Sequence, residues 1–375
     1  MASASSQLQL SDLTVIDVDS HIDEDVEDLL PYVESSGATR TLESADLRRE
    51  VFTDTRPTPP FPTTDSLVDK GDLENPDLVH VRGADPAAKQ EFMQRYDIDY
   101  SLLTTAMFGF AGINNDVVAV ELAKAFNRWV TAEYLPTFDM DRVKATLLVP
   151  NQRPNAAAEI IDQWGDEECF AGVQLPAAGL VPPAGHHWYD PIYEAAERHD
   201  LPVCMHSGSA TGMFSFPLQQ RWARTFTESH ALIFPIESMW HLNSLIFRGA
   251  PERFPDLNWV IVESGVEWVP WMTWRMDDHY LQNSQDVPVL DRPPSSYIDE
   301  QFYFTTMPLG HTDAAHHQAT MIDAAGAESS ILFASDHPHP DLDLPDELFG
   351  TLSRNLDEDA TRAVMGESAA ELFDF

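Results

Sequence analysis

Cysteines and long apolar runs are scarce in this chain of 375 residues. Its two cysteines, Cys169 and Cys204, lie among apolar neighbours, so we expect buried free thiols in a reducing compartment. No run approaches the ~18 consecutive apolar residues that a membrane-spanning helix needs. The N-terminal stretch has neither the basic region nor the apolar run of a signal peptide. These absences predict a cytoplasmic protein.

Basic residues are scarce as well. Lys plus Arg number 22, of which four are lysines, against 62 Asp plus Glu, which gives a formal net charge of −40. Nucleic acids and anionic membrane surfaces are bound by basic patches, so we expect neither as a partner. An acidic, self-repelling surface is tolerable where salt screens it, because the Debye length falls to about 3 Å at 1 M ionic strength. The composition predicts a halophilic protein, with a merely acidic mesophilic protein as the alternative.

Strand-like and helix-like stretches alternate along the chain. The predicted strands are mostly continuous apolar runs, as in parallel strands buried on both faces, at 14–18, 100–105, 144–149, 171–175, 201–206, 259–263, 302–306 and 330–335. Apolar residues at helical spacing predict helices at 115–134, 155–164, 191–199, 235–247, 313–325 and 358–373. This alternation predicts the α/β class and a (β/α)8 TIM barrel. A doubly wound open sheet is the alternative, which the absence of a glycine-rich loop after the first strand disfavours.

The segment 23–99, between the first two predicted strands, is too long for a single crossover helix. It contains the proline-rich stretch "PTPPFPTT" and a charged helix that ends near Tyr96. We expect one barrel domain over residues 1–375, with 23–99 inserted on the rim where it covers the site. A disordered linker between two domains is the alternative, but it would separate the first strand from its barrel.

Histidine and aspartate stand where three predicted strands end. In barrel enzymes the catalytic groups come from the C-terminal ends of the strands. Here those ends read "DVDSH", "LPVCMHSGS" and "ILFASDHPH", and they supply Asp19, His21, His206 and Asp336. Taken singly, these residues could be a buried histidine or a helix N-cap. Together they predict one divalent metal ion at the barrel mouth (Zn, Mn, Mg or Fe(II)), with a position left open for water or substrate.

Three further patterns carry expectations about neighbouring side chains. Asp17 alternates with Asp19 and His21, so a regular strand would point all three to one face, with Asp17 outside the ligand set and orienting a neighbour. His339 is expected either to hydrogen-bond the site or to cap its loop. The spacing of Trp268, Trp271 and Trp274 predicts packing of all three in the core.

Five segments resemble one known family in order and spacing. They are "VIDVDSHI", "LPVCMHSGS", "FRGAPERFPDLNWVIVESGVEWVPWMTWRMDD", "ILFASDHPHPD" and "VMGESAAELF". They resemble the amidohydrolase-related family, in the branch that contains α-amino-β-carboxymuconate-ε-semialdehyde decarboxylase and γ-resorcylate decarboxylase. The resemblance covers nearly the whole chain except 23–99. It implies a (β/α)8 fold, a single divalent metal, usually zinc or manganese, and is compatible with a homodimer.

The resemblance also assigns the ligands. The His-x-His of the family's first strand falls on Asp19 and His21, its strand-five histidine on His206, and its strand-eight aspartate on Asp336. Aspartate in place of the first histidine favours Mn, Mg or Fe(II) relative to Zn. Because no lysine lies near the end of the fourth strand, a carbamate-bridged two-metal site is excluded.

The catalytic positions depart further from the family. The histidine that closes the sixth strand in the decarboxylases is Glu263 here, and Glu267 matches a glutamate that follows it in some members. We expect Glu263 or Glu267 to move a proton in the reaction, and Asp336 to take part in catalysis beside them. His230, in "TESHALIF", is a further acid–base or substrate-binding candidate, and a histidine on a helix surface explains it equally well.

Three function classes remain, and the first is the one that the resemblance implies. We expect a carboxy-lyase, a non-oxidative decarboxylase, that acts on a small aromatic or unsaturated carboxylic acid. The first alternative is a metal-dependent hydrolase that attacks an amide, a lactone or a C–C bond with metal-bound water. The second alternative is a non-catalytic metal-binding barrel. The first two classes differ in chemistry, because one releases CO2 and the other consumes water.

Overall fold

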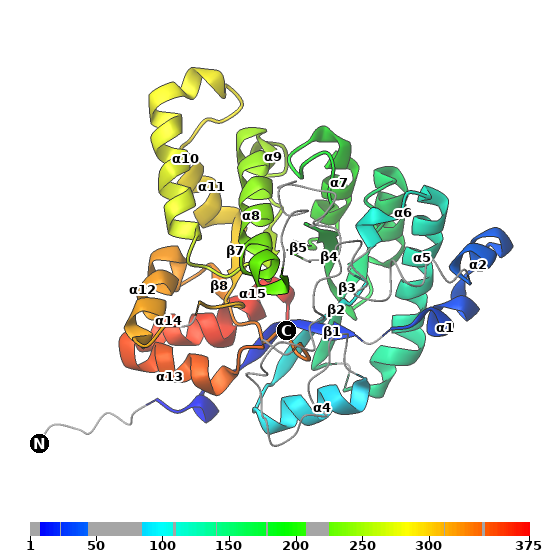
Figure 1. The fold of residues 1–375 in the computed structure, drawn as a ribbon, viewed down its shortest axis with the longest axis horizontal. Coiled ribbons are helices and arrows are strands. Elements are labelled where there is room, and N and C mark those ends of the chain that lie inside the picture. Colours follow the sequence, from blue (N-terminus) through cyan, green and yellow to red (C-terminus); the bar gives the residue numbers. More distant parts are fainter. Residues whose placement is uncertain are drawn as a thin grey trace, which may run out of the picture.

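Eight parallel strands, joined edge to edge in chain order, form the centre of the molecule. The computed structural model describes residues 8–22, 24–43, 85–107, 110–139, 141–177, 179–207, 225–310, 312–339 and 342–375. The strands are β1 (Ile16–Ile22), β2 (Tyr100–Thr105), β3 (Val143–Leu148), β4 (Phe170–Pro176), β5 (Val203–His206), β6 (Trp259–Val262), β7 (Phe302–Thr305) and β8 (Ile331–Leu332). Helices surround them (Figure 1). The fold is the predicted (β/α)8 barrel.

The barrel closes where β1 meets the chain around β8. The amide of Val18 donates to the carbonyl of Phe333 at 3.1 Å, and the amide of Asp336 donates to the carbonyl of Asp19 at 2.9 Å. A further bridge pairs Ser20 with His337. We call these paired segments, residues 17–22 and 333–337, the β1–β8 seam. They bring the ends of the first and last strands together at one edge of the barrel.

The helices fall between the strands as the alternation predicts. They are α1 (Val26–Leu29), α2 (Ser36–Leu42), α4 (Pro86–Arg95), α5 (Asp116–Trp129), α6 (Pro154–Trp164), α7 (Asp190–Arg198), α8 (Phe226–Phe247), α9 (Ala250–Arg253), α10 (Val269–Asn283), α11 (Pro294–Gln301), α12 (Ala315–Gly326), α13 (Pro345–Asn355), α14 (Glu358–Arg362) and α15 (Ser368–Phe373). The helix expected to end near Tyr96 is α4. Most of the 23–99 segment, residues 44–84, lies outside the described residues.

The start of α8 differs from the prediction. Apolar residues at helical spacing predict a helix over 235–247. Instead α8 begins at Phe226, and Pro235 lies inside it. Thr225 caps the helix, since its hydroxyl accepts a hydrogen bond from the amide of Glu228 at 3.1 Å. The cap satisfies an amide of the first turn, which the helix itself leaves without a partner.

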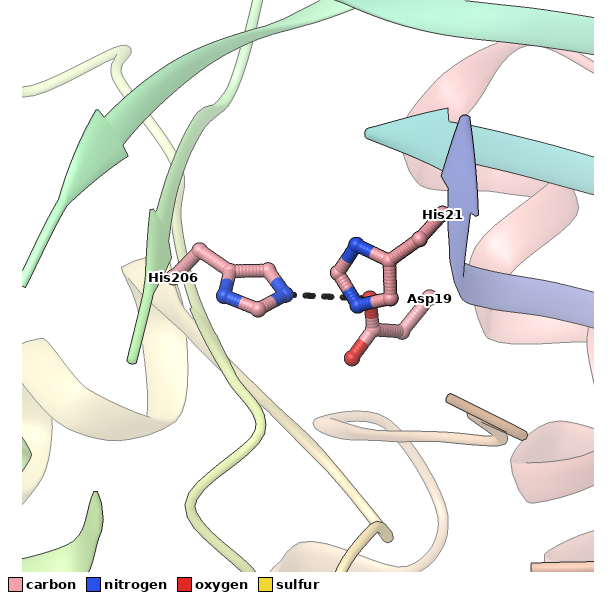
Figure 2. A group of neighbouring side chains, drawn as sticks. All are labelled: Asp19, His21 and His206. Carbon is pink, nitrogen blue, oxygen red and sulfur yellow. Dashed lines mark hydrogen bonds and ion pairs between the residues drawn. The ribbon is translucent and has the colours of Figure 1, made fainter. Parts of the chain in front are cut away.

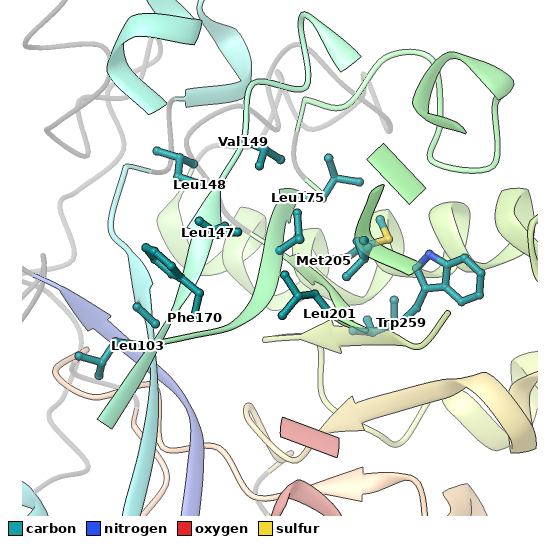
Figure 3. Close-up of a cluster of buried hydrophobic side chains, with 14 of the residues drawn as sticks. Leu103, Leu147, Leu148, Val149, Phe170, Leu175, Leu201, Met205 and Trp259 are labelled. Atoms are coloured by element: carbon teal, nitrogen blue, oxygen red, sulfur yellow. The ribbon is translucent and has the colours of Figure 1, made fainter. Parts of the chain in front are cut away.

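Apolar side chains alternate between two layers along each strand. Those facing outward pack against the helices in one large cluster, part of which Figure 3 shows around Leu147, Leu175 and Trp259. Those facing inward fill the barrel, including Cys204 and Val260, with α15 packed against them. Both cysteines are buried free thiols, as expected. Burying each large side chain contributes about 1.5–3 kcal/mol, so this double layer is the main stabilising feature of the barrel.

The tryptophan prediction for α10 holds at one position of three. Trp268 is 7 % exposed and donates its indole N–H to the carbonyl of Ser264 at 3.0 Å. Trp271 and Trp274 are 53 % and 66 % exposed. The buried face of α10 is formed by Val269, Met272 and Met276, and at about 100° per residue Trp271 and Trp274 point away from it. Among the helices that the structure describes, none combines the length and the hydropathy of a membrane span.

A buried histidine joins α8 to the loop after β4. The His241 ring donates from Nε2 to the carbonyl of Ala177 at 2.9 Å, and its Nδ1 accepts from the amide of Ala184 at 3.2 Å. The backbones approach so closely here that a Cβ on Gly185 would lie 2.0 Å from the carbonyl oxygen of Ser244. Burial lowers the pKa of His241 to about 4. The neutral ring is therefore the form that fits.

This pKa predicts a pH dependence of stability. The unfolded histidine titrates near 6.5, so it takes up a proton between pH 6.5 and 4 that the folded ring refuses, and stability falls as the pH falls through this window. Between pH 7 and pH 5 the free energy of unfolding of the native protein should fall by about 2 kcal/mol more than that of His241→Gln. Denaturant titrations at the two pH values measure this, with His187→Gln, at an exposed position, as the control. Equal losses in native protein and His241→Gln would contradict the prediction.

Candidate metal centre

A bulge in β1 decides which of its polar side chains enter the barrel. The register with β2 shifts between Asp17 and Ser20. Ile16 and Val18 face the interior and Asp17 faces outward. Asp19, which directly follows Val18 within the shifted stretch, also faces the interior, and so does His21 after the shift. The expectation that all three polar residues share one face is therefore wrong, because the extra residue of the bulge reverses the alternation.

Three of the predicted ligands meet at the mouth of the barrel. The Nε2 atom of His206 lies 3.2 Å from Oδ1 of Asp19, and Nε2 of His21 lies 3.6 Å from the same oxygen. Figure 2 shows His206, at the end of β5, facing Asp19 and His21 from β1. Ligand atoms of these three residues lie within 4.8 Å of one another, close enough to share one ion.

Asp336 joins the group through His21. Its Oδ1 lies 2.9 Å from Nε2 of His21 and 2.7 Å from Nδ1 of His339. His21, Asp336 and His339 form a second group whose ligand atoms lie within 4.8 Å of one another. The structure thus brings together the four residues that the sequence predicts, and adds His339 beside them. Of the two expectations for His339, the hydrogen bond to the site is confirmed.

The two imidazoles present the nitrogen atoms that a metal ligand needs. The Nδ1 atom of His206 donates to the carbonyl of Ser207, so in the neutral ring Nε2 carries the free electron pair. Burial alone would lower the pKa of His206, but the Asp19 carboxylate raises it overall. Burial and the neighbouring ring of His339 lower the pKa of His21 well below its usual range. A divalent ion would compete with a proton at His206 and hardly at all at His21.

The carboxylates of the site also fit a bound cation. Asp19 and Asp336 are 0 % and 1 % exposed, yet Oδ2 of each has no hydrogen-bond partner among the described residues. A buried carboxylate oxygen without a donor is costly, and a positive ion removes that cost. Two carboxylates and two imidazoles make a donor set that suits a divalent first-row metal. The residues therefore fit the predicted metal ion.

Glu263 lies beside the ligands in a strained backbone conformation. Its Oε2 is 3.6 Å from Nδ1 of His206, and its side chain is 7 % exposed. The amide of Glu263 donates to the hydroxyl of Thr305 at 3.0 Å. Both Glu263 and Asp336 have positive φ angles, 54° and 60°. Left-handed residues other than glycine cost free energy and cluster at functional sites.

Two predicted catalytic residues do not join the group. Both carboxylate oxygens of Glu267 accept backbone hydrogen bonds, from the amides of Gly310 and Val266, and in the described residues no bond connects Glu267 to the metal ligands. It ties the loop after β7 to the start of α10. His230 is half-buried on the first turns of α8, with its ring edge against Phe234 at 4.8 Å. Within the part of the chain that the structure describes, neither residue belongs to a group that could share an ion.

Some residues around the site are absent from the sequence-based prediction. Lys89, on α4, donates to Asp17 at 3.0 Å, and Glu24 accepts a short hydrogen bond from the hydroxyl of Thr105. The carbonyl of Thr105 in turn favours the protonated ring of His21. The one available signal was the position of Lys89 in a helical stretch before the second strand. A lysine in such a helix is normally predicted to be solvent-exposed, and only the tertiary structure shows its contact with Asp17.

Comparison with known proteins places the chain in a family. The family model described as amidohydrolase matches residues 16–375. The chain therefore belongs to the amidohydrolase family and is a metal-dependent enzyme of that superfamily. No curated protein matches it in sequence.

Solved structures share the fold at low sequence identity. The 5-carboxyvanillate decarboxylase of Sphingomonas paucimobilis is 19 % identical, with a TM-score of 0.70 over 97 % of this chain and 99 % of that one. An amidohydrolase of Mycobacterium avium subsp. paratuberculosis K-10 is 18 % identical, with a TM-score of 0.71 over 96 % and 99 %. A dihydroxybenzoic acid decarboxylase of Polaromonas sp. JS666, with bound manganese and the inhibitor 2-nitroresorcinol, is 18 % identical, with a TM-score of 0.65 over 96 % and 97 %. These similarities establish the barrel.

Metal analysis tests the centre directly. Purified, dialysed protein should contain about one divalent ion per chain, because the ligands described above supply a single site. Asp336→Ala should lose it, since the change removes a buried ligand. Asp162→Ala is the control, because Asp162 lies on the surface of α6 and pairs with Arg198. Full metal content in Asp336→Ala would contradict the assignment.

Proposed function

We propose that the protein is a metal-dependent carboxy-lyase that removes CO2 from a small aromatic or unsaturated carboxylic acid. The observation that carries this proposal is the buried Glu263 carboxylate, 3.6 Å from the ring of His206 and beside a set of two carboxylates and two imidazoles. Two of the structures that share the fold are decarboxylases of benzoic acid derivatives, and one of them holds manganese. The family and the donor set both support a reaction at a single divalent metal.

Asp19, His21, His206 and Asp336 are the residues that would hold the ion. When bound, a divalent metal supplies a Lewis acid that orients a carboxylate or hydroxyl of the substrate. The carbonyl of Ser207 fixes His206 in the tautomer that this role needs. His339 holds Asp336 through a 2.7 Å hydrogen bond, and thereby fixes the direction of its carboxylate. Asp19 biases the choice of ion toward Mn, Mg or Fe(II), because it replaces an imidazole by an anionic oxygen.

Glu263 is the proposed proton donor. Decarboxylation replaces the bond from carbon to the carboxylate by a bond to hydrogen, so one proton must reach that carbon. The electron pair of the broken C–C bond stays with the substrate, and CO2 leaves. Protonated Glu263 would deliver the proton and regain one from solvent after each turnover. Asp336 is the second group that could exchange a proton with the substrate, since its carboxylate lies at the same mouth.

A panel of substrates tests the reaction class. Hydroxybenzoates, carboxymuconate-like acids and lactones are offered to the metal-loaded protein in high salt, and CO2 and ring opening are followed separately. Release of CO2 from at least one acid is expected. Lactone opening without CO2 would show the alternative hydrolase, in which Glu263 activates water instead. Full activity after removal of the metal would exclude both.

Replacing Glu263 separates metal binding from chemistry. Glu263→Gln should keep the metal, because Glu263 is not among the ligands, and should lose turnover by about 100-fold or more, the usual contribution of a general acid. Steady-state kinetics and metal content are measured on the same preparation. Glu194→Gln, on the exposed face of α7, is the matched control. Turnover that survives Glu263→Gln would assign this carboxylate a structural role.

A further inference from the structure

Lys89 is a fully buried lysine behind the metal centre. Its side chain is 0 % exposed, although it lies on α4, in a stretch rich in charged residues. Burying an ammonium group is costly unless it is paired and hydrogen-bonded. Its Nζ donates to Oδ2 of Asp17 at 3.0 Å and to the hydroxyl of Ser20 at 2.6 Å. Removal of Lys89 or of Asp17 would leave the other residue with a buried charge that no opposite charge in this pair compensates.

Asp17, which pairs with Lys89, also hydrogen-bonds residues on both strands of the β1–β8 seam. Its carboxylate accepts from the amide and the hydroxyl of Ser335 at 2.9 and 2.8 Å, and from the amide of Asp19 at 3.3 Å. Asp19 is itself a predicted ligand, and Ser335 directly precedes Asp336. One carboxylate therefore holds the backbone at both carboxylate ligands of the metal.

Two further contacts connect α4 to the same seam. Ser20, which accepts from Lys89, donates its hydroxyl to the carbonyl of His337 at 2.9 Å. The ring of Phe92, one turn along α4 from Lys89, stacks on the ring of His337 at 3.9 Å with an interplanar angle of 22°. The helix thus packs against the side of the seam that carries Asp17 and His337, while Asp19 and His21 face the barrel interior.

We propose that the Asp17–Lys89 pair is a positioning unit for the metal centre, which sets the relative placement of Asp19 and Asp336. The unit acts through the backbone of the two ligand segments and touches neither substrate nor metal. This inference rests on the metal site of the proposed function and not on its reaction. It also gives α4, the described end of the segment between β1 and β2, a part in building the site.

Electrostatics and positioning predict opposite effects when Lys89 is replaced. A buried cation near the site repels a divalent ion, so loss of its charge alone would strengthen metal binding. Loss of positioning would weaken binding, because Asp19 and Asp336 would no longer be held at the distance that the ion needs. The sign of the change in affinity therefore separates the two roles.

The experiment uses Co(II) bound to the full-length protein. Lys89→Met should weaken Co(II) binding ten-fold or more and change the position or intensity of its visible absorption bands, which depend on ligand geometry. Lys144→Met is the matched control, because Lys144 bonds the backbone carbonyls of Phe373 and Asp374, at the C-terminal helix, and not the seam. It should leave affinity and spectrum unchanged. Circular dichroism confirms that each variant is folded at the temperature of the titration.

Binding of equal or greater strength with an unchanged spectrum in Lys89→Met would overturn the proposal. If Lys89→Met does not fold, the double variant Asp17→Asn/Lys89→Met replaces it, since this variant leaves no buried charge unpaired. It should still weaken Co(II) binding at least three-fold, because Ser20 loses its donor and Ser335 its carboxylate; native affinity in the double variant would overturn the proposal. Native protein that binds no Co(II) would instead contradict the proposed function.

Discussion

The hydrogen bonds of the β1–β8 seam are the interactions on which the rest of the structure depends. They close the barrel, since the last strand has no other neighbour to complete the sheet, and they also place the ligands. The amide of Asp336 donates to the carbonyl of Asp19, and the amide of His21 donates to the carbonyl of His337, both at 2.9 Å. The same main-chain bonds thus serve stability and the site. A change that opens the seam would therefore disturb both the closure of the barrel and the placement of Asp19, His21 and Asp336.

The buried charges of the described residues are mostly negative, and each needs a compensating partner. The described residues that are both buried and acidic are Asp17, Asp19, Glu24, Glu237, Glu263 and Asp336, against Lys89 as the one buried lysine or arginine among them. Such an excess of buried carboxylates is tolerable only where hydrogen bonds or a cation compensate it. Asp17 has the lysine, and Asp19 and Asp336 have each an oxygen that a metal ion would satisfy. Carboxylates on the surface need no such partner, because water solvates them and salt screens their repulsion.

Much of the fold, and the grouping of Asp19, His21, His206 and Asp336, could be predicted from the sequence. Continuous apolar runs identify parallel strands, and polar residues at the ends of those strands identify the mouth of the barrel, because both patterns are local. The bulge in β1, the role of Lys89 and the exposure of Trp271 and Trp274 could not be predicted, since they depend on contacts between distant segments. The apolar spacing placed the start of α8 too late, because the helix begins at Phe226 and continues through Pro235. The positions of Glu267 and His230 outside the ligand group likewise emerge only from tertiary packing.

The left-handed backbone at Glu263 and Asp336 limits how such a site can evolve. A β-branched side chain at a φ of 54° or 60° would meet its own backbone, so valine, isoleucine and threonine are poor replacements whatever their chemistry. Aspartate, asparagine and histidine tolerate this region best among residues with a side chain. Exchange of Glu263 for aspartate, asparagine or histidine therefore costs the fold less than exchange for a β-branched residue. At both positions the backbone conformation favours side chains that can bind a metal or move a proton.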